Sequence, residues 1–224
     1  MLLCIETSQQ TCSIAIFDFG GMLSYAFSDA ANIHGKLITM LIEEAATKAG
    51  IELKELKAIC LSAGPGSYTG LRVGSSTAKG LGYGLKIPLI AIDTLQIMAL
   101  AMQKQMPEMH YCPLVDARRM EVFTGLYDSS LCPTLPGHPA IVDEGFMLPA
   151  LQFKQVVFGG NGLEKCKPFL QSNPNAILQE NIKPTADLMG ALAFNKFTTN
   201  HFADMAYFEP NYLKEFQGTK PKVA

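Results

Sequence analysis

The sequence lacks the residue patterns that most metal, redox and nucleic-acid-binding proteins use. Only four histidines occur, and neither HExxH nor HxxxH is present, so the common two-histidine metal motifs are excluded. Six cysteines lie far apart with no CxxC pair, and we expect buried, reduced thiols. Apart from a weakly basic tail there is no lysine or arginine run, and the formal net charge is −2. The composition therefore gives no electrostatic sign of direct RNA binding.

Long apolar runs are also missing, so no segment is predicted to span a membrane. The N-terminal sequence MLLCIETS has no basic segment before its apolar residues and is expected to be a strand rather than a signal peptide. We expect a soluble, cytoplasmic protein. With 224 residues, 48% of them hydrophobic, the chain suits one large or two small domains.

The first half alternates strands and helices. Strands are predicted at 2–5, 13–18 and 22–27, joined by turns, and a helix is predicted at 32–49, ended by Gly50. The apolar residues of that helix cover more of its circumference than packing on one sheet requires. The helix is therefore expected either to be buried on two sides or to meet a partner.

The stretch 58–84 organises this half. It reads as an apolar strand, a Gly-Pro-Gly turn, and a helix that carries a small residue at every fourth position: Gly70, Gly74, Ala78 and Gly82. Each interior glycine costs a helix about 1 kcal/mol relative to alanine. The pattern therefore predicts that another backbone lies very close to this small face.

The next strand, 87–92, completes a parallel βαβ unit, so the order is βββαβαβ before a helix at 93–104. Beyond 107–110, strands at 111–116 and 121–127 repeat the opening hairpin, which predicts a duplicated fold with a cleft between its halves. We place an N-terminal lobe at 1–108 and a smaller, degenerate lobe at 109–224. The prolines between 133 and 139 are expected in a loop, and a helix is expected at 186–198.

Four stretches are candidates for chemistry. The loop at Gly64 and Gly66 resembles a phosphate cradle, but it matches neither the P-loop nor the G-x-G-x-x-G spacing, and a tight structural turn is the favoured interpretation. The hairpin turns 6–8 and 116–118 could cup phosphates between the lobes, or their residues could bond their own backbone. No histidine pair predicts a metal centre. Ser67 lacks the trailing glycine of a G-x-S-x-G nucleophile. The chain therefore offers phosphate loops without a convincing catalytic group, which indicates a binding subunit.

The segment SAGPGSYTGLRVGSSTAKGL, residues 62–81, resembles the signature of the bacterial TsaB/YeaZ family. LLCIETSQQTCSIAIF at the start, VDARRMEVFTGLY at 115–127 and PNYLK at 210–214 are similar to the corresponding family stretches. The likeness covers the first half closely and the second half only at islands. Within the second half, Gly159-Gly160-Asn161-Gly162 departs from a Gly-Asp-Gly-like loop at Asn161.

The resemblance implies an α/β, two-lobed fold of the actin/Hsp70/sugar-kinase (ribonuclease-H-like) type. It also implies a non-catalytic scaffold or activator of the transferase that makes threonylcarbamoyladenosine (t6A) in tRNA next to the anticodon. The catalytic paralogue TsaD carries an HxxxH metal pair where this chain has Thr94 and Met98, which do not replace histidine ligands. No catalytic residue and no metal site are therefore expected in this chain. The alternative is a free-standing weak ATPase or a peptidase of the glycoprotease-like family.

The resemblance further implies that the chain pairs with TsaD through helices of the first lobe and forms a homodimer where TsaD is absent. It also implies that the complex recruits the ATPase TsaE and that a separate synthase supplies threonylcarbamoyl-AMP. Contact with tRNA would be only indirect. ATP and a metal would belong to the partner subunits, with no cofactor bound by this chain alone. The expected interface residues are Leu37, Leu41, Ala45, Gly70, Arg72, Gly74, Ala78 and Gly82. The candidate nucleotide-binding residues are Thr7, Gly64, Gly66, Asp116, Gly159 and Gly160.

Overall fold

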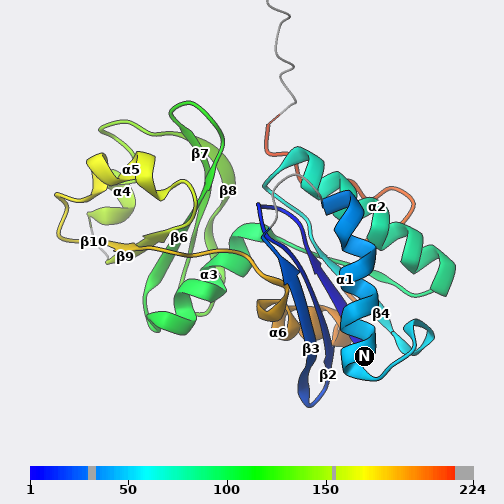
Figure 1. The fold of residues 1–224 in the computed structure, drawn as a ribbon. Coiled ribbons are helices and arrows are strands. Elements are labelled where there is room, and N and C mark those ends of the chain that lie inside the picture. Colours follow the sequence, from blue (N-terminus) through cyan, green and yellow to red (C-terminus); the bar gives the residue numbers. More distant parts are fainter. Residues whose placement is uncertain (30–33, 153–154, 215–224) are drawn as a thin grey trace, which may run out of the picture.

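The computed structural model describes residues 1–29, 34–152 and 155–214. They form two five-stranded sheets, each with its own helices (Figure 1). The strands are β1 Leu2–Glu6, β2 Cys12–Asp18, β3 Gly21–Ser28, β4 Ala58–Ser62, β5 Leu89–Ile92, β6 His110–Asp116, β7 Glu121–Tyr127, β8 Pro133–Ile141, β9 Val156–Gly159 and β10 Ala176–Gln179. The α-helices are α1 His34–Ala49, α2 Tyr68–Leu85, α3 Thr94–Gln105, α4 Leu148–Leu151, α5 Leu163–Leu170 and α6 Gly190–Thr198, with short 3-10 helices η1 Leu53–Glu55 and η2 Ala186–Leu188.

The first sheet has the order β3-β2-β1-β4-β5. β1 pairs antiparallel with β2 and parallel with β4, and β4 pairs parallel with β5, as the βββαβαβ prediction requires. β1 and β4 are central strands and every residue of both is buried, which is why they read as unbroken apolar runs. The predicted α/β order of this lobe is confirmed.

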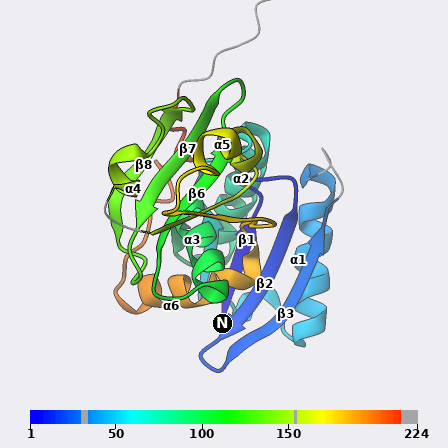
Figure 2. The same cartoon turned by 90° about the vertical axis from the view of Figure 1, so that its left-hand side faces the viewer.

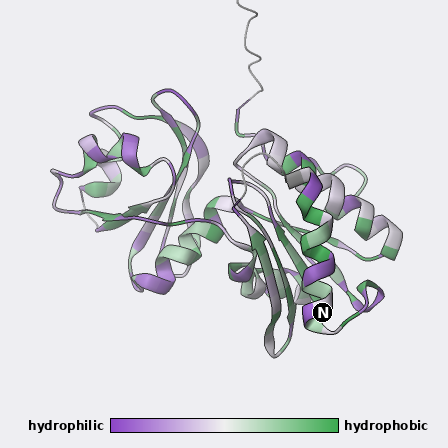
Figure 3. Cartoon of the chain, in the orientation of Figure 1, coloured by the Kyte–Doolittle hydropathy of each residue, from purple (hydrophilic) through white to green (hydrophobic). Residues whose placement is uncertain are grey.

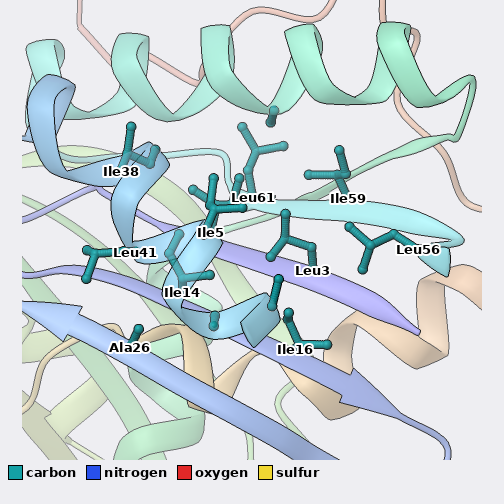
Figure 4. Close-up of a cluster of buried hydrophobic side chains, with 14 of the residues drawn as sticks. Leu3, Ile5, Ile14, Ile16, Ala26, Ile38, Leu41, Leu56, Ile59 and Leu61 are labelled. Atoms are coloured by element: carbon teal, nitrogen blue, oxygen red, sulfur yellow. The ribbon is translucent and has the colours of Figure 1, made fainter. Parts of the chain in front are cut away.

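Two cores lie on the two faces of the first sheet. Leu3, Ile5 and Ile59 point toward α1 and α2, where they pack with Ile38 and Leu41 of α1 (Figure 4). The intervening residues of the same strands point to the opposite face, because successive side chains of a strand alternate. Figure 3 shows the hydrophobic colour concentrated along these strands. The excess apolar residues of α1 are thus largely explained by burial against its own lobe.

The second sheet repeats the plan. Its order, β8-β7-β6-β9-β10, matches the first sheet strand for strand, with β6–β7 and β7–β8 antiparallel and β6–β9 and β9–β10 parallel. The predicted duplication is therefore confirmed at the level of topology. The expected loop at 133–139 is wrong: these prolines lie in β8. Because β8 is an edge strand with irregular register, proline costs it few ladder hydrogen bonds.

The helix that follows each fifth strand packs on the other lobe. α3 leaves the first sheet and buries Met98 and Met102 against β6, β7 and β9. η2 and α6 leave the second sheet and bury Ala186, Met189 and Ala193 against β1 and β5 (Figure 1, Figure 2). The predicted extent of the second lobe, 109–224, therefore needs correction, because most of the described residues between 186 and 214 pack against the first lobe. Within the described residues, no helix is long and apolar enough to cross a membrane.

Candidate functional site between the lobes

The polar groups of the first sheet gather at the carboxyl ends of its parallel strands. β1 ends at Glu6, β4 ends at Ser62, and β5 leads into Asp93, the N-cap of α3. Register places Glu6 beside Ser62, and Ser62 beside Ile92. This edge faces the second lobe and is where open α/β sheets bind ligands.

Glu6 is the most unusual group at this edge. Its carboxyl is fully buried, and burial raises its pKa from about 4.5 to about 6, although the hydrogen bond from the Ser8 backbone opposes the rise. Glu6 Oε1 accepts a hydrogen bond from Ser8 N. Among the described residues, Glu6 Oε2, Ser8 Oγ and Thr94 Oγ1 are buried and have no hydrogen-bond partner. The sequence signal for this site was a single acidic residue at the end of an apolar strand.

The turn after Glu6 is held by α2. Thr7 Oγ1 donates to Gly70 O at 2.9 Å, and a Cβ at Gly70 would lie 2.1 Å from Thr7 O. A Cβ at Gly74 would lie 2.2 Å from Thr7 Oγ1. The predicted close approach is therefore real, but the approaching backbone belongs to this chain. Thr7 is consequently occupied in packing and does not present its hydroxyl to a nucleotide.

The Gly-Pro-Gly turn is equally closed. Gly64 has φ +107°, and a Cβ there would lie 2.7 Å from Asn211 O of the C-terminal segment. A Cβ at Gly66 would lie 2.2 Å from Ser8 O, and Ser67 N donates to the same oxygen at 2.6 Å. Both glycines serve close packing of backbones. Of the two readings left open by the sequence, the structure supports the structural turn.

The second-lobe hairpin turn is exposed and has its own partners. The Asp116 carboxylate forms an ion pair with Lys165 of α5 and accepts from Arg118 N at 2.7 Å. Lys165 Nζ also donates to two carbonyls of the turn, those of Arg119 at 2.7 Å and Glu121 at 3.0 Å. Asp116 is therefore tied to its own lobe rather than aimed at a ligand.

Gly159 and Gly160 lie where the second lobe meets α3. A Cβ at Gly159 would lie 2.9 Å from Met102 Cε, and one at Gly160, which has φ +129°, would lie 2.5 Å from Met98 Cε and 2.2 Å from Leu114 O. Gln9 Nε2 approaches Met98 Sδ at 3.5 Å from the first lobe. The thioether of Met98 thus fills the space between the lobes, at a position where the resemblance puts a metal ligand in TsaD.

A small cavity of about 320 Å³ remains between the lobes. Its lining includes Gln10, Gly160, Glu164, Glu180 and Lys183. Two carboxylates and one lysine do not suit a triphosphate, and of the six candidate nucleotide-binding residues only Gly160 lines this cavity. The residues present therefore fit ATP poorly.

The residues present also fit a metal poorly. No group of three or more His, Cys, Asp or Glu side chains gathers in the described part of the chain. Thr94 and Met98 are both fully buried. A hydroxyl and a thioether are weak substitutes for imidazoles at a transition-metal site.

Asp93 marks the point where α3 passes between the lobes. Its carboxylate caps α3 by accepting from Leu95 N at 2.7 Å and Gln96 N at 3.3 Å, and it accepts from Tyr127 Oη of the second lobe at 3.5 Å. Burial raises the pKa of Asp93 and of Tyr127, and burial lowers the pKa of Lys196. This group joins the lobes and was not predicted, because its members are far apart in sequence.

Most of the predicted partner-interface residues are not on the surface. Those buried in the first lobe are Leu41, Ala45, Gly70, Gly74, Ala78 and Gly82. Leu37 is half-buried, and a Cβ at Gly82 would lie 2.6 Å from Met205 Cε. The small face of α2 packs within the chain, so the exposed surface gives no support to the expected contact of this face with a partner. Arg72 is exposed, as an interface residue must be.

A different surface of the same two helices is open. α1 and α2 lie side by side over the first sheet (Figure 1). Met40 on α1 is 61% exposed and Tyr83 on α2 is 83% exposed. Arg72 stacks over the Tyr68 ring, 4.2 Å from its centroid. We call the outward side of the pair, marked by Met40, Arg72, Ser76 and Tyr83, the α1–α2 surface.

Comparisons with known proteins agree with this geometry. The family model of TsaD, tRNA N6-adenosine threonylcarbamoyltransferase, matches residues 15–131. The Escherichia coli protein "tRNA threonylcarbamoyladenosine biosynthesis protein TsaB" is 26% identical over 222 residues, which cover 95% of this chain and 94% of that protein. A Legionella pneumophila tRNA N6-adenosine threonylcarbamoyltransferase is 32% identical over 127 residues, covering 50% of this chain and 38% of that protein.

Solved structures show the fold. A Pseudomonas aeruginosa protein described as similar to peptidase YEAZ superposes with a TM-score of 0.83 at 24% identity, covering 95% of this chain and 99% of that chain. A second structure, YeaZ from Pseudomonas aeruginosa, gives 0.80 at 24% identity, with the same shares covered. The fold is a two-lobed α/β fold with one mixed five-stranded sheet in each lobe, as predicted. The chain belongs to the family that the TsaD model describes and, within it, to the TsaB/YeaZ group.

Proposed function

We propose that this chain takes part in the biosynthesis of t6A in tRNA as a non-catalytic subunit that pairs with a TsaD homologue. The names of its relatives support a role in t6A biosynthesis. The space between the lobes, which Met98 fills, supports the non-catalytic role. The observation that carries the proposal is Met98, whose buried thioether occupies the space between the lobes beside Gly160 and Gln9.

The chemistry of the reaction also supports a catalytic partner and a non-catalytic role for this chain. Transfer of the threonylcarbamoyl group to adenosine needs groups that orient the activated acyl donor and stabilise charge as the bond forms. At the carboxyl edge of the first sheet, the only fully buried carboxyl is Glu6 among the described residues. We assign the chemistry, with its ATP and metal, to the partner subunits. TsaE and the threonylcarbamoyl-AMP synthase act as further components, and tRNA is contacted indirectly.

We place the docking site on the α1–α2 surface. Met40, Tyr83 and Arg72 are exposed, and methionine, tyrosine and arginine are residue types enriched in protein interfaces. Two helices packed side by side can receive two helices of a partner with ordinary ridge-into-groove geometry. The same surface would support a homodimer where TsaD is absent. A cytoplasmic location follows from the same assignment, because tRNA is modified there.

The test is to mix the purified chain with the TsaD homologue of the same genome and to analyse the mixture by size-exclusion chromatography at micromolar concentrations. We expect one co-eluting complex. Separate elution of the two proteins would contradict the proposal. Calorimetric titration of the isolated chain with ATP and magnesium tests the alternative, since tight binding with turnover would indicate a free-standing ATPase.

A further inference from the structure

The segment after α6 has no helix or strand of its own, yet it contacts both lobes. It runs from Thr199 to Lys214, passing β5, the C-terminal part of α2 and the Gly64 turn before it reaches the second lobe. We call it the C-terminal strap. In Figure 1 it follows α2 in the orange to red part of the chain.

The strap is anchored on the first lobe by many contacts. Ala203 N donates to Leu89 O at 2.8 Å, forming a bridge to the edge strand β5. Lys79 Nζ of α2 donates to two strap carbonyls, Ala206 O and Phe208 O, each at 3.2 Å. Met205 fills the space over Gly82. These hydrogen bonds act together with the partly buried side chains of Ala203, Met205 and Phe208, so this end of the strap is fixed.

The middle of the strap closes the Gly64 turn. Asn211 N donates to Ala63 O at 2.6 Å, and Asn211 O faces Gly64 closely enough to exclude a side chain there. The Tyr212 ring lies 5.1 Å from the ring of Tyr68, in the first turn of α2. The strap therefore also holds the start of α2.

The far end makes few contacts, and they are with the second lobe. Lys214 Nζ pairs with Glu121 of β7 at 2.6 Å. A Cβ at Gly137 of β8 would lie 3.6 Å from Leu213 Cδ1 and 3.1 Å from Leu95 Cδ1 of α3. Leu213 thus sits at the junction of α3 and the second sheet. A partly exposed ion pair contributes little to stability, so this end is the one that can detach.

We propose that the C-terminal strap is an interlobe latch, anchored on the first lobe and closed on the second through Leu213 and Lys214, and that it sets the angle between the lobes. Two other connections in the described part of the chain, α3 and the η2–α6 segment, pack into the buried core of the opposite lobe. The latch adds a further contact between the lobes, on β7 and β8 beside the start of α3. Opening it would leave both cores intact while freeing the lobes to rotate about α3.

The chain offers a direct measurement. Cys132, in the turn between β7 and β8, is the exposed cysteine, and the other five are buried. Glu43→Cys on the exposed side of α1 supplies a second labelling site. Spin labels on this introduced thiol and on Cys132 report the interlobe distance distribution by double electron–electron resonance. The disrupted variant is Leu213→Ala with Lys214→Glu. The matched control is Lys48→Glu, which breaks an ion pair of the same 2.6 Å length to Glu44 within α1.

We expect the disrupted variant to show a broader or shifted distance distribution, with unchanged circular dichroism, and the control to match the unmodified chain. Adding Glu121→Lys to Lys214→Glu restores the ion pair with its charges exchanged and should narrow the distribution again. A disrupted variant whose distribution coincides with that of the control would overturn the latch. If that variant unfolds, the single Lys214→Glu variant decides in the same way, since it removes only a partly exposed contact.

Discussion

The two lobes share one topology but end their first strands differently. β1 ends at Glu6, which is fully buried and raised in pKa, whereas β6 ends at Asp116, which is exposed and paired with Lys165. In the first lobe the turn is covered by α2, whose small face admits the backbone of Thr7. In the second lobe α5 is only eight residues long and reaches its turn with one lysine. The same fold thus carries a closed polar turn in one lobe and an open one in the other.

The helices of the first lobe are also longer than their counterparts in the second lobe. α1 and α2 have 16 and 18 residues, and their counterparts α4 and α5 have 4 and 8. Long helices bury one side on the sheet and still offer an outward side, which is the α1–α2 surface. The short helices α4 and α5 cover their sheet but have little outward-facing surface. The second lobe is thus reduced in its helices, and the longer helices of the first lobe support the proposal that docking takes place there.

The largest expected effect comes from the small face of α2, which α5 lacks. Gly70→Ala places a Cβ 2.1 Å from Thr7 O, a backbone atom that cannot move without opening the turn. We expect a loss of about 3 kcal/mol in the free energy of unfolding, measured by urea denaturation followed by circular dichroism.

The matched control lies on the same helix. Gly80 has nothing within 4 Å of its Cβ position, so Gly80→Ala should stabilise the protein by up to about 1 kcal/mol. Equal stability of the two variants would contradict the packing described for Gly70.

The second expected effect is a difference in how Glu6, at the end of β1, and Asp116, at the end of β6, make the free energy of unfolding depend on pH. Folding raises the pKa of Glu6 from about 4.5 to about 6, so the folded state favours the protonated carboxyl. The contribution of Glu6 to the free energy of unfolding is therefore fully present below pH 4.5. As pH rises through 6, about 2 kcal/mol of stability is lost. Glu6→Gln should remove this loss and leave the variant more stable than the parent at pH 7.

Asp116→Asn is the control from the other lobe, because its carboxylate is exposed and its ion pair contributes about 1 kcal/mol or less. Urea denaturation of both variants at several pH values between 4 and 8 makes the comparison. A Glu6→Gln variant that keeps the parent's pH dependence would show that Glu6 is not its source.

The third effect tests docking with one exposed apolar residue from each lobe. Met40 is 61% exposed on α1 and Ile141 is 65% exposed on β8. Met40→Glu should weaken association with the TsaD homologue about tenfold, as expected when about 1.4 kcal/mol is lost at an interface. Ile141→Glu should leave the affinity unchanged. Calorimetry measures both, and the reverse ranking would move the docking site to the second lobe.

The sequence predicted the local order well and the distant contacts poorly. Gly70 correctly predicted a close backbone, whereas the group close to Gly74 is the side chain of Thr7. The four-residue period alone could not show that Thr7, more than sixty residues away, supplies both contacts. The prolines of β8 predicted a loop because proline opposes central strands, and nothing local showed that this strand lies at an edge. The return of α6 to the first lobe depends on tertiary packing, which residue spacing does not record.

The candidate site was predicted in the same uneven way. Position 98 was recognised by resemblance as a lost ligand position, but only the structure shows that Met98 fills the interlobe space. Asp116 was a reasonable candidate for phosphate binding until Lys165, on another element, was seen to pair with it. Exposure of Met40 and Tyr83 depends on which face of each helix the sheet covers. The apolar periodicity of α1 predicted its buried face but did not predict which apolar residues lie exposed on the opposite face.

The most direct test of the central claim is restoration of t6A in a cell extract that lacks its own TsaB. Mass spectrometry of the tRNA would measure the modified nucleoside with and without this chain, in the presence and absence of TsaD. We predict that the chain restores t6A only when TsaD is present, and that Met40→Glu restores less. Restoration without TsaD, or none with it, would contradict the account of a docking subunit whose own cleft is closed.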